Sequence, residues 1–430
     1  MIYKYYVSLS FFLFLFLLIY TSIMADIGSS DTTSVCYKTA DCTFEYCVEK
    51  SNLGANEYEL MIAEQPNERS LIKQLGILDR FLIVWILLAM IIGVIIGYFV
   101  PHVQESFEVI QFGSVSVPIA IGLLVMMYPV LCKVQYERLN IILSNKQIWL
   151  QILISVIINW IIGPIIMTAL AWACLPDLPG FRTGVVMVGL ARCIAMVFIW
   201  NTLAGGDPDY CAVLVAINSI LQIALYSPYS LLFINIIPSW FGASVDQSIH
   251  VDTWPVAQSV LIYLGIPLIA GIITRYTLRW LKGSSWYDHR FLLYFGPLAL
   301  IGLLYTIIIM FANQGHHIIT HIGSVARVAV PLIIYFLVMF FIPFFLLKSV
   351  FHFPYELVVT QSFTAGSNNF ELAIAVAVGT YGIQSEQALA ATIGPLIEVP
   401  VLLCLVYVSL YFKRKLNWGE KKKKNESSIP

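Results

Sequence analysis

The sequence predicts an all-α polytopic protein that crosses a membrane many times. Of its 430 residues, 59% are hydrophobic and only 11% are charged, which is more apolar surface than a water-soluble chain of this size can bury. About ten apolar segments follow one another, and most approach the ~20 residues that a helix needs to cross a bilayer. Helices are expected because an open chain in lipid must pair its backbone groups within each segment.

Polar connections separate these ten transmembrane segments. The segments are expected near residues 79–100, 114–132, 147–174, 184–204, 209–237, 254–279, 291–312, 326–349, 357–380 and 386–412. Lys and Arg collect in alternate connections, at 133–146, at 275–290 and after residue 412, whereas residues 101–108, 238–252 and 313–324 contain neither. This alternation places both ends of the membrane core in the cytoplasm.

The two halves of the membrane core show a weak internal repeat. Sliding the chain along itself lays Cys193 on Glu371, and a slightly shorter shift lays Gln222 on Glu398. Five crossings per half is an odd number, so the second half must be upside down relative to the first. We therefore expect two inverted five-helix repeats, residues 78–250 and 251–416, followed by a basic cytoplasmic tail, residues 417–430.

A separate N-terminal part precedes this core. Residues 1–25 contain a short apolar run that fits either a signal sequence or an extra transmembrane helix, and residues 26–77 form a polar tail that we expect to be loosely ordered. The tail contains Cys36, Cys42 and Cys47. These three cysteines could form a disulfide plus one free thiol, a clamp for a soft metal or metalloid ion, or neither.

Polar residues interrupt two of the apolar segments. In one segment, Gly366-Ser-Asn-Asn-Phe-Glu371 breaks the apolar run, and in the other Arg192 and Cys193 precede a Gly-rich stretch. An unpaired ionisable residue within a membrane costs at least about 2.5 kcal/mol on insertion scales, so such residues are functional candidates. We expect a site where the two interrupted helices meet.

Each polar residue in these interruptions has two possible roles. The guanidinium of Arg192 would favour a thiolate at Cys193, which is a soft ligand for a metal or metalloid; alternatively, Cys193 only packs and Arg192 pairs with Glu371 or with carbonyls. Glu371 could carry a proton or be a static partner. Asn368 and Asn369 could hold hydroxyls or an ion, or could bond between helices.

A second group of residues is expected to be structural. Glu398 and Gln222 are interpreted as a polar brace, with a transport role for Glu398 as the alternative. His316, His317 and His321 could bind zinc on a helix, but they lie in a predicted external loop without an acidic partner, so no metal site is expected.

No nucleotide-binding or hydrolase motif occurs in its proper context, and no basic face interleaves with aromatic residues. We expect no catalytic residue, no cofactor and no nucleic-acid partner.

Four motifs resemble one family of transporters. The segments LLVMMYPVLCKVQYERL, LARCIAMVFIWNTLAGGD, SNNFELAIAVA and IGPLIEVPVL are similar to arsenite efflux permeases of the arsenical-resistance type, in the bile-acid/arsenite transporter superfamily, and residues 159–175 resemble fungal members. The resemblance covers residues 78–416. It implies ten transmembrane helices in two inverted repeats, with the fourth and ninth helices broken where they cross.

The same resemblance implies a function and a site. Family members export arsenite, some also carry antimonite, and many exchange the substrate for protons across the lipid bilayer. The family's motif residues fall on Cys193 and Glu371, so we expect substrate binding at Cys193, Arg192, Asn368, Asn369 and Glu371, with proton coupling at Glu371. The alternative is a sodium-coupled organic-anion symporter of the same fold, such as a bile-acid importer. The plasma membrane is favoured over the vacuolar membrane.

Overall fold

The computed structural model describes residues 34–38, 45–49, 81–100, 111–112, 115–134, 136, 146–242, 250–320 and 322–418. The signal-like segment 1–25, Cys42, His321 and the basic tail beyond residue 418 lie outside these residues. The chain divides into two units, Met1–Gly76 and Ile77–Pro430. The described helices all lie in the second unit.

The first unit contains a short β-hairpin where we had expected only a loosely ordered tail. Strand β1 (Ser34–Lys38) pairs antiparallel with β2 (Glu45–Glu49), in a register that sets Cys36 opposite Cys47. Both strands alternate β-branched or aromatic residues with other residues, a pattern that favours extended backbone. This local pattern is hidden by the polar composition of the tail as a whole.

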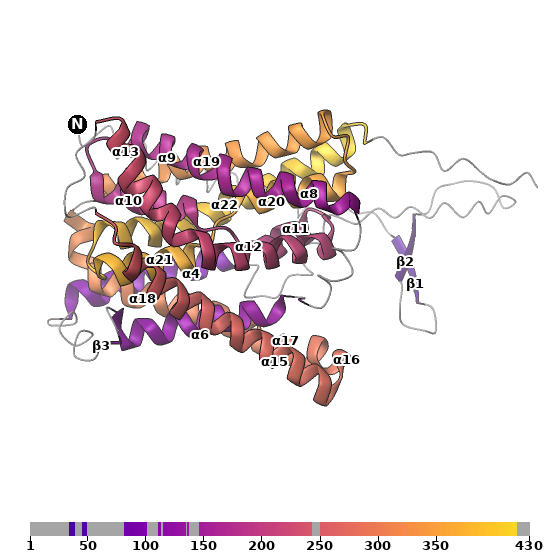
Figure 1. Ribbon diagram of the computed structural model, residues 1–430. Helices are drawn as coiled ribbons and strands as arrows, with labels where there is room; N and C mark the ends of the chain where they lie inside the picture. Colours follow the sequence, from indigo (N-terminus) through magenta and orange to yellow (C-terminus); the bar gives the residue numbers. More distant parts are fainter. Residues whose placement is uncertain are drawn as a thin grey trace, which may run out of the picture. The chain divides into compact units, whose positions relative to one another are not determined.

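The described part of the second unit is almost entirely helical (Figure 1). Its α-helices are α4 (Leu82–Phe99), α6 (Val117–Lys133), α8 (Lys146–Ile157), α9 (Gly163–Cys174), α10 (Pro179–Leu190), α11 (Val197–Leu203), α12 (Pro208–Ser230), α13 (Ile237–Trp240), α14 (Thr253–Val260), α15 (Ile266–Lys282), α16 (Ser284–Trp286), α17 (Leu292–Phe295), α18 (Pro297–Thr320), α19 (Ile322–Ser349), α20 (Tyr355–Gly366), α21 (Phe370–Tyr381) and α22 (Glu386–Lys415). Among the described residues, π-helical turns join some of these helices, namely η2 (Ile158–Ile162), η3 (Leu231–Ile236), η4 (Leu261–Gly265) and η5 (Tyr287–Phe291). Strands β3 (Gln111–Phe112) and β4 (Val115–Ser116) form a small antiparallel pair.

The helical stretches confirm a polytopic membrane protein. Among the described residues, six stretches are long and apolar enough to cross a bilayer: Ile148–Cys174, Pro208–Trp240, Thr253–Lys282, Ser284–Asn313, Gly323–Ser349 and Glu386–Lys415. Three shorter apolar helices are Val84–Phe99, Val117–Lys133 and Phe370–Tyr381. The all-α fold class is therefore confirmed, while the count of ten crossings and the inversion of the halves stay predictions.

Proline explains where three of the long helices widen into π-helical turns. The turns η2, η3 and η4 each end two residues before a proline, namely Pro164, Pro238 and Pro267. Proline has no backbone N–H and its ring clashes with the carbonyl four residues earlier. A wider turn relieves that clash without ending the helix, so each stretch remains long enough to span a bilayer.

The helices of the second unit pack into two groups. In the first group, α18 lies against both α4 and α6, and α6 lies against α15. In the second group, α22 packs against α10, α19 and α21, while α19 packs against α9 and α20. Figure 1 shows the first group towards the lower side and the second towards the upper side of the helical unit. The groups meet where α22 contacts α4 and α18, and where α21 contacts α6.

Two interrupted helices have matching bounds. Helix α10 runs from Pro179 to Leu190 and α20 from Tyr355 to Gly366, so one shift along the chain superimposes both their starts and their ends. Each is followed by a non-helical break and a second short helix, α11 or α21. We had expected two apolar segments that polar residues interrupt. The structure shows that the first helical part of each ends at Leu190 and at Gly366. The equal spacing is what a duplicated unit would produce.

An exposed ion pair ties the loop before α10 to α19. The guanidinium of Arg327 donates to Asp177, through Nη1 to Oδ2 at 2.7 Å, and Nη2 also donates to the Cys174 carbonyl at 3.3 Å. The hydrogen bond from Arg327 is the main reason that the pKa of Asp177 falls to about 2. The pair therefore stays charged at physiological pH and does not make the loop sensitive to protons.

Close contact between α4 and α18 predicts the effect of one substitution. A Cβ added at Gly93 would lie 2.6 Å from Phe311 Cβ and 2.7 Å from the Ile308 carbonyl oxygen. Small residues allow membrane helices to approach this closely, and overpacking such a contact costs about 1–3 kcal/mol. We expect Gly93→Ala to lower the apparent melting temperature of the purified protein.

The matched control for this variant is Gly265→Ala. Its added Cβ would meet its nearest neighbour at 3.7 Å, an ordinary contact, so its melting temperature should stay close to that of the parent. Equal melting temperatures for the Gly93→Ala variant and the parent would show that α4 and α18 do not pack as described.

Candidate functional site

The two interrupted helices meet through their main chains. Helix α10 ends at Leu190 and helix α20 ends at Gly366, and the residues after both are extended. Arg192 and Asn368 form an antiparallel bridge, and the Asn369 N–H donates to the Ala191 carbonyl at 3.1 Å. Unpaired backbone groups are costly in lipid. Each break supplies hydrogen-bond partners for some of the backbone groups of the other. We call this contact the crossing, and define it as residues 191–193 with residues 367–369.

Asparagine side chains complete the crossing from the second break. The Asn368 amide donates to the Val188 carbonyl at 2.8 Å and to the Ala191 carbonyl at 3.0 Å, which are carbonyls at the end of α10. Asn369 caps the start of α21 by accepting from the Leu372 N–H at 3.1 Å. Helix ends leave such groups without intrahelical partners, and the two asparagines supply partners in both halves.

Two residues on the neighbouring long helices also hold the crossing. Gln222 of α12 accepts through Oε1 from the Arg192 N–H at 3.1 Å, and more weakly from the Asn369 amide at 3.4 Å. Glu398 of α22 accepts through Oε1 from the Asn368 N–H at 3.2 Å and also from the Ser367 hydroxyl. We had expected Gln222 and Glu398 to form one brace facing each other. In the structure, Gln222 instead bonds mainly to the first break, at Arg192, and Glu398 bonds to the second, at Asn368.

The Arg192 side chain is directed toward α9 and α19. It is fully buried, and its Nη2 donates to the Gly189 carbonyl and, at 2.7 Å, to the Tyr335 hydroxyl. A Cβ added at Gly163 of α9 would lie 2.7 Å from Arg192 Nη1. Within the described part of the chain, Arg192 makes no ion pair with Glu371. Of the alternatives left open for Arg192, the geometry favours bonding to a carbonyl over pairing with a carboxylate.

The Cys193 thiol lies inside the crossing and is only 1% exposed. Its Sγ accepts from the Val197 N–H at 3.3 Å, in the first turn of α11. The thiol also interacts with the Ser367 side chain, and Ser367 in turn donates to Glu398. The structure thus connects Cys193 to the carboxylate of Glu398 through one serine. Sequence reasoning had linked Cys193 to Glu371 instead.

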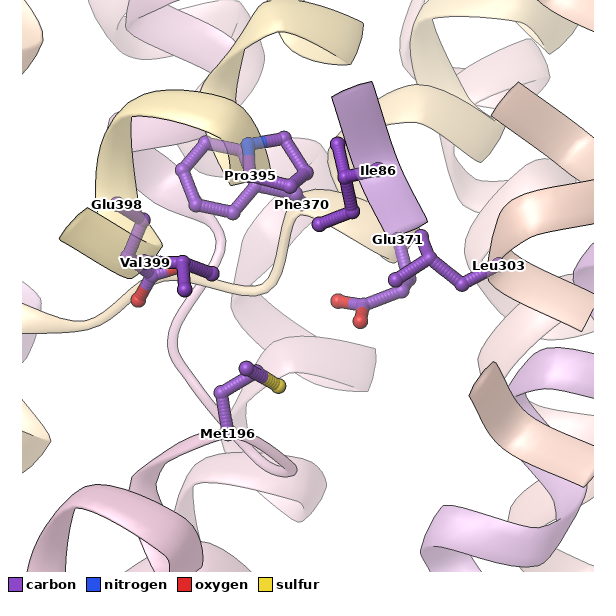
Figure 2. Close-up of a pocket in the computed structure, with 8 residues that line it drawn as sticks. All are labelled: Ile86, Met196, Leu303, Phe370, Glu371, Pro395, Glu398 and Val399. Atoms are coloured by element: carbon purple, nitrogen blue, oxygen red, sulfur yellow. The ribbon is translucent and has the colours of Figure 1, made fainter. Parts of the chain in front are cut away.

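A pocket lies beside the crossing, where the two helix groups meet. Two carboxylates, one thioether and apolar side chains line it; its residues are Ile86, Met196, Leu303, Phe370, Glu371, Pro395, Glu398 and Val399. Figure 2 shows the Met196 sulfur and the Glu371 carboxylate directed toward the same space, with Glu398 on its other side. Two carboxylates and a sulfur thus converge in a pocket that is otherwise apolar, which makes this pocket the candidate site.

The predicted site residues divide between the pocket and the crossing. Glu371 and Glu398 line the pocket, whereas Cys193, Asn368 and Asn369 lie in the crossing and are almost fully buried. Arg192 and Gln222 are also at the crossing. Glu371 is partly exposed.

Sequence reasoning missed two residues of this site. Met196 lines the pocket with a soft sulfur, and Ser367 joins Cys193 to Glu398. Met196 lies three residues after Cys193 in the same interrupted segment, which is the only signal that could have found it. The role of Ser367 depends on contact between segments and has no signal in its local sequence.

Several buried polar atoms of the crossing and of Gln222 beside it have no hydrogen-bond partner in the described part of the chain. They are Nε and Nη1 of Arg192, Nε2 of Gln222 and Oδ1 of Asn368. Buried polar groups normally find a partner, so each of these needs an explanation. A polar solute with several hydroxyl groups could bond with such donors and acceptors. Within the described residues, no group of three or more His, Cys, Asp or Glu side chains could hold a metal ion.

Comparison with known proteins identifies the family of this chain. Residues 120–321 match the sodium bile acid symporter family. The chain is 46% identical over 343 residues to the arsenical-resistance protein Acr3 of Corynebacterium glutamicum, covering 80% of this chain and 91% of that protein. It is 32% identical over 347 residues to the arsenical-resistance protein Acr3 of Alkaliphilus metalliredigens, covering 78% of this chain and 93% of that protein.

A further relative has a less specific name. The chain is 32% identical over 354 residues to an uncharacterized transporter of Synechocystis, covering 78% of this chain and 88% of that protein. The family and this relative are both described as transporters, so this chain is a multi-pass membrane transporter rather than an enzyme. The chain therefore belongs to the sodium bile acid symporter family, in its group of Acr3-type arsenical-resistance proteins.

Proposed function

We propose that this transporter exports arsenite from the cytoplasm in exchange for protons. The observation that carries the proposal is the 46% identity to an arsenical-resistance protein over 91% of that protein's length. The similarity also covers 80% of this chain. Antimonite is proposed as a second substrate because it has the same trivalent, hydroxylated chemistry. The proposed location is the plasma membrane.

The site supports this proposal through its soft and polar groups. Trivalent arsenic favours soft sulfur ligands, and Cys193 and Met196 supply a thiol and a thioether from the same break, between α10 and α11. In aqueous arsenite, arsenic carries hydroxyl groups, for which the unpartnered atoms of Asn368 and Gln222 are suitable partners. Binding to Cys193 would replace one As–O bond by an As–S bond, with the thiol proton and the departing hydroxyl leaving as water.

Glu371 is the proposed carrier of the exchanged proton. It lies in the first turn of α21, lines the pocket and is partly exposed. An ionisable group inside a membrane span is by default part of an ion or proton pathway. A proton that reaches Glu371 from the outside would neutralise the pocket and so favour its return to the cytoplasmic-facing state.

The alternative function is sodium-coupled transport of an organic anion, as the family's description suggests. The chemistry of the pocket wall argues against it. The carboxylates of Glu371 and Glu398 both line the pocket and would repel an organic anion. A small, uncharged hydroxylated solute would meet no such repulsion.

Substitution of the two proposed key residues should stop transport. We expect Cys193→Ala and Glu371→Gln each to lower arsenite uptake into everted vesicles by about tenfold or more, the effect of losing ~1.4 kcal/mol of interaction. The measurement is initial uptake at equal amounts of folded protein. Cys404→Ala is the matched control, because this half-buried thiol lies on α22 outside the pocket lining. Parent-like uptake by either key variant would remove that residue from the mechanism.

The nature of the driving ion separates the two proposed functions. In proteoliposomes, an imposed proton gradient should change the rate of arsenite movement several-fold, whereas a sodium gradient of equal size should leave it unchanged, because the proposed coupling group, Glu371, takes up a proton. Uptake of labelled arsenite is measured with each gradient in turn. Acceleration by sodium alone, or uptake of a labelled bile acid in place of arsenite, would contradict the proposal.

A further inference from the structure

Gln222 and Glu398 hold equivalent peptide groups in the two halves of the protein. Gln222 accepts from the Arg192 N–H at 3.1 Å, and Glu398 accepts from the Asn368 N–H at 3.2 Å. The two acceptors are as far apart along the chain as the two donors, and the same spacing relates α10 to α20. Arg192 and Asn368 are themselves paired in the antiparallel bridge. The crossing is thus held by one matched residue from each half.

The two matched residues differ in one chemical respect. Gln222 is an amide and stays neutral at every pH, whereas Glu398 can gain or lose a proton. A hydrogen bond from an N–H to a carboxylate is roughly twice as strong as one between neutral groups. Protonation of Glu398 therefore weakens its hydrogen bond to the Asn368 N–H and leaves the hydrogen bond between Gln222 and the Arg192 N–H unchanged.

The surroundings of Glu398 contain few other groups that could titrate in its place. Among the described residues, the ionisable groups that act on Glu398 are Glu371 of α21 and Cys193 of the first break. Its other partners, Ser367 and Asn368, are neutral. Helices α4 and α18 present apolar side chains to the same pocket, through Ile86 and Leu303. Glu371 is the one neighbouring carboxylate among the described residues, so its protonation must be controlled for.

We propose that Glu398 is a proton-sensitive positioning residue, which closes the second break while ionised and releases it when protonated, whereas Gln222 holds the first break at all pH values. Release of the second break also frees Ser367, which interacts with Cys193. Protonation of Glu398 thereby exposes the buried thiol to the pocket. Only this last step, the link to substrate, rests on the proposed function.

Backbone hydrogen exchange tests these two hydrogen bonds, from Asn368 to Glu398 and from Arg192 to Gln222, without any substrate. After correction for intrinsic exchange rates, residues 366–372 of the parent should exchange about tenfold faster in acidic than in alkaline buffer, because the charge-assisted bond to Asn368 is lost. Residues 190–196 should show no such change. Because arsenite is absent, failure of the proposed function would leave this result intact.

Three variants assign the effect to Glu398. Glu398→Gln keeps an acceptor for the Asn368 N–H but cannot be ionised, so the pH dependence at residues 366–372 should disappear. Gln222→Glu should create a matching pH dependence at residues 190–196, since it places a carboxylate on the Arg192 peptide. Glu371→Gln is the control. It removes a charge that acts on Glu398, so the midpoint of the pH dependence at residues 366–372 should shift, but the dependence itself should persist.

Two results would overturn the proposal. One is corrected exchange at residues 366–372 of the parent that does not vary with pH. The other is a pH dependence that persists in Glu398→Gln or vanishes in Glu371→Gln, since either would assign the effect to a different group. The first result needs no substitution, so it holds even where a variant fails to fold.

Discussion

Breaking a helix inside a membrane leaves peptide groups that lipid cannot satisfy, and this constraint shapes the centre of the protein. Each break at the crossing uses the other: the Asn369 N–H bonds to Ala191, and the Asn368 amide bonds to carbonyls at the end of α10. Gln222 and Glu398 satisfy the remaining peptide N–H groups of Arg192 and Asn368. Neither break can be satisfied alone, so the two halves must meet at this point.

This constraint also separates the structural polar groups from those free to act on a solute. Arg192 looks from the sequence like a substrate-binding cation, yet its guanidinium is bonded to Gly189 and Tyr335, away from Glu371. The pocket beside the crossing is lined by the two carboxylates and by Met196. Cys193 lies between these regions, because its thiol is part of the crossing and is joined to the pocket through Ser367 and Glu398. In the proposed cycle, release of the second break brings the Cys193 thiol to the pocket that the Met196 sulfur already lines.

The sequence predicted the fold class and the positions of the two breaks for clear physical reasons. Long apolar segments require helices in lipid, and Arg192, Cys193 and the Ser-Asn-Asn run are so costly there that they had to mark a special site. The partners of these residues could not be predicted. Tyr335 is far from Arg192 in the sequence, and no local pattern shows that the guanidinium turns toward it. The shift that laid Cys193 on Glu371 is slightly longer than the one that relates Arg192 to Asn368 in the bridge, so the weak sequence repeat alone does not give the register of the crossing.

The direct test of the crossing is a disulfide between its two strands. The bridge between Arg192 and Asn368 sets Cys193 opposite position 367, and facing positions in an antiparallel pair are about 4.5–5.5 Å apart at Cα, within the range for a disulfide. Ser367→Cys is placed in a chain that keeps Cys193 as its only other cysteine and carries a protease site between the halves, at residues 243–249. After mild oxidation and cleavage, the account predicts that the two halves stay joined until reductant is added, while a chain with Ser285→Cys instead comes apart. Separation of the halves in the Ser367→Cys chain would contradict the account.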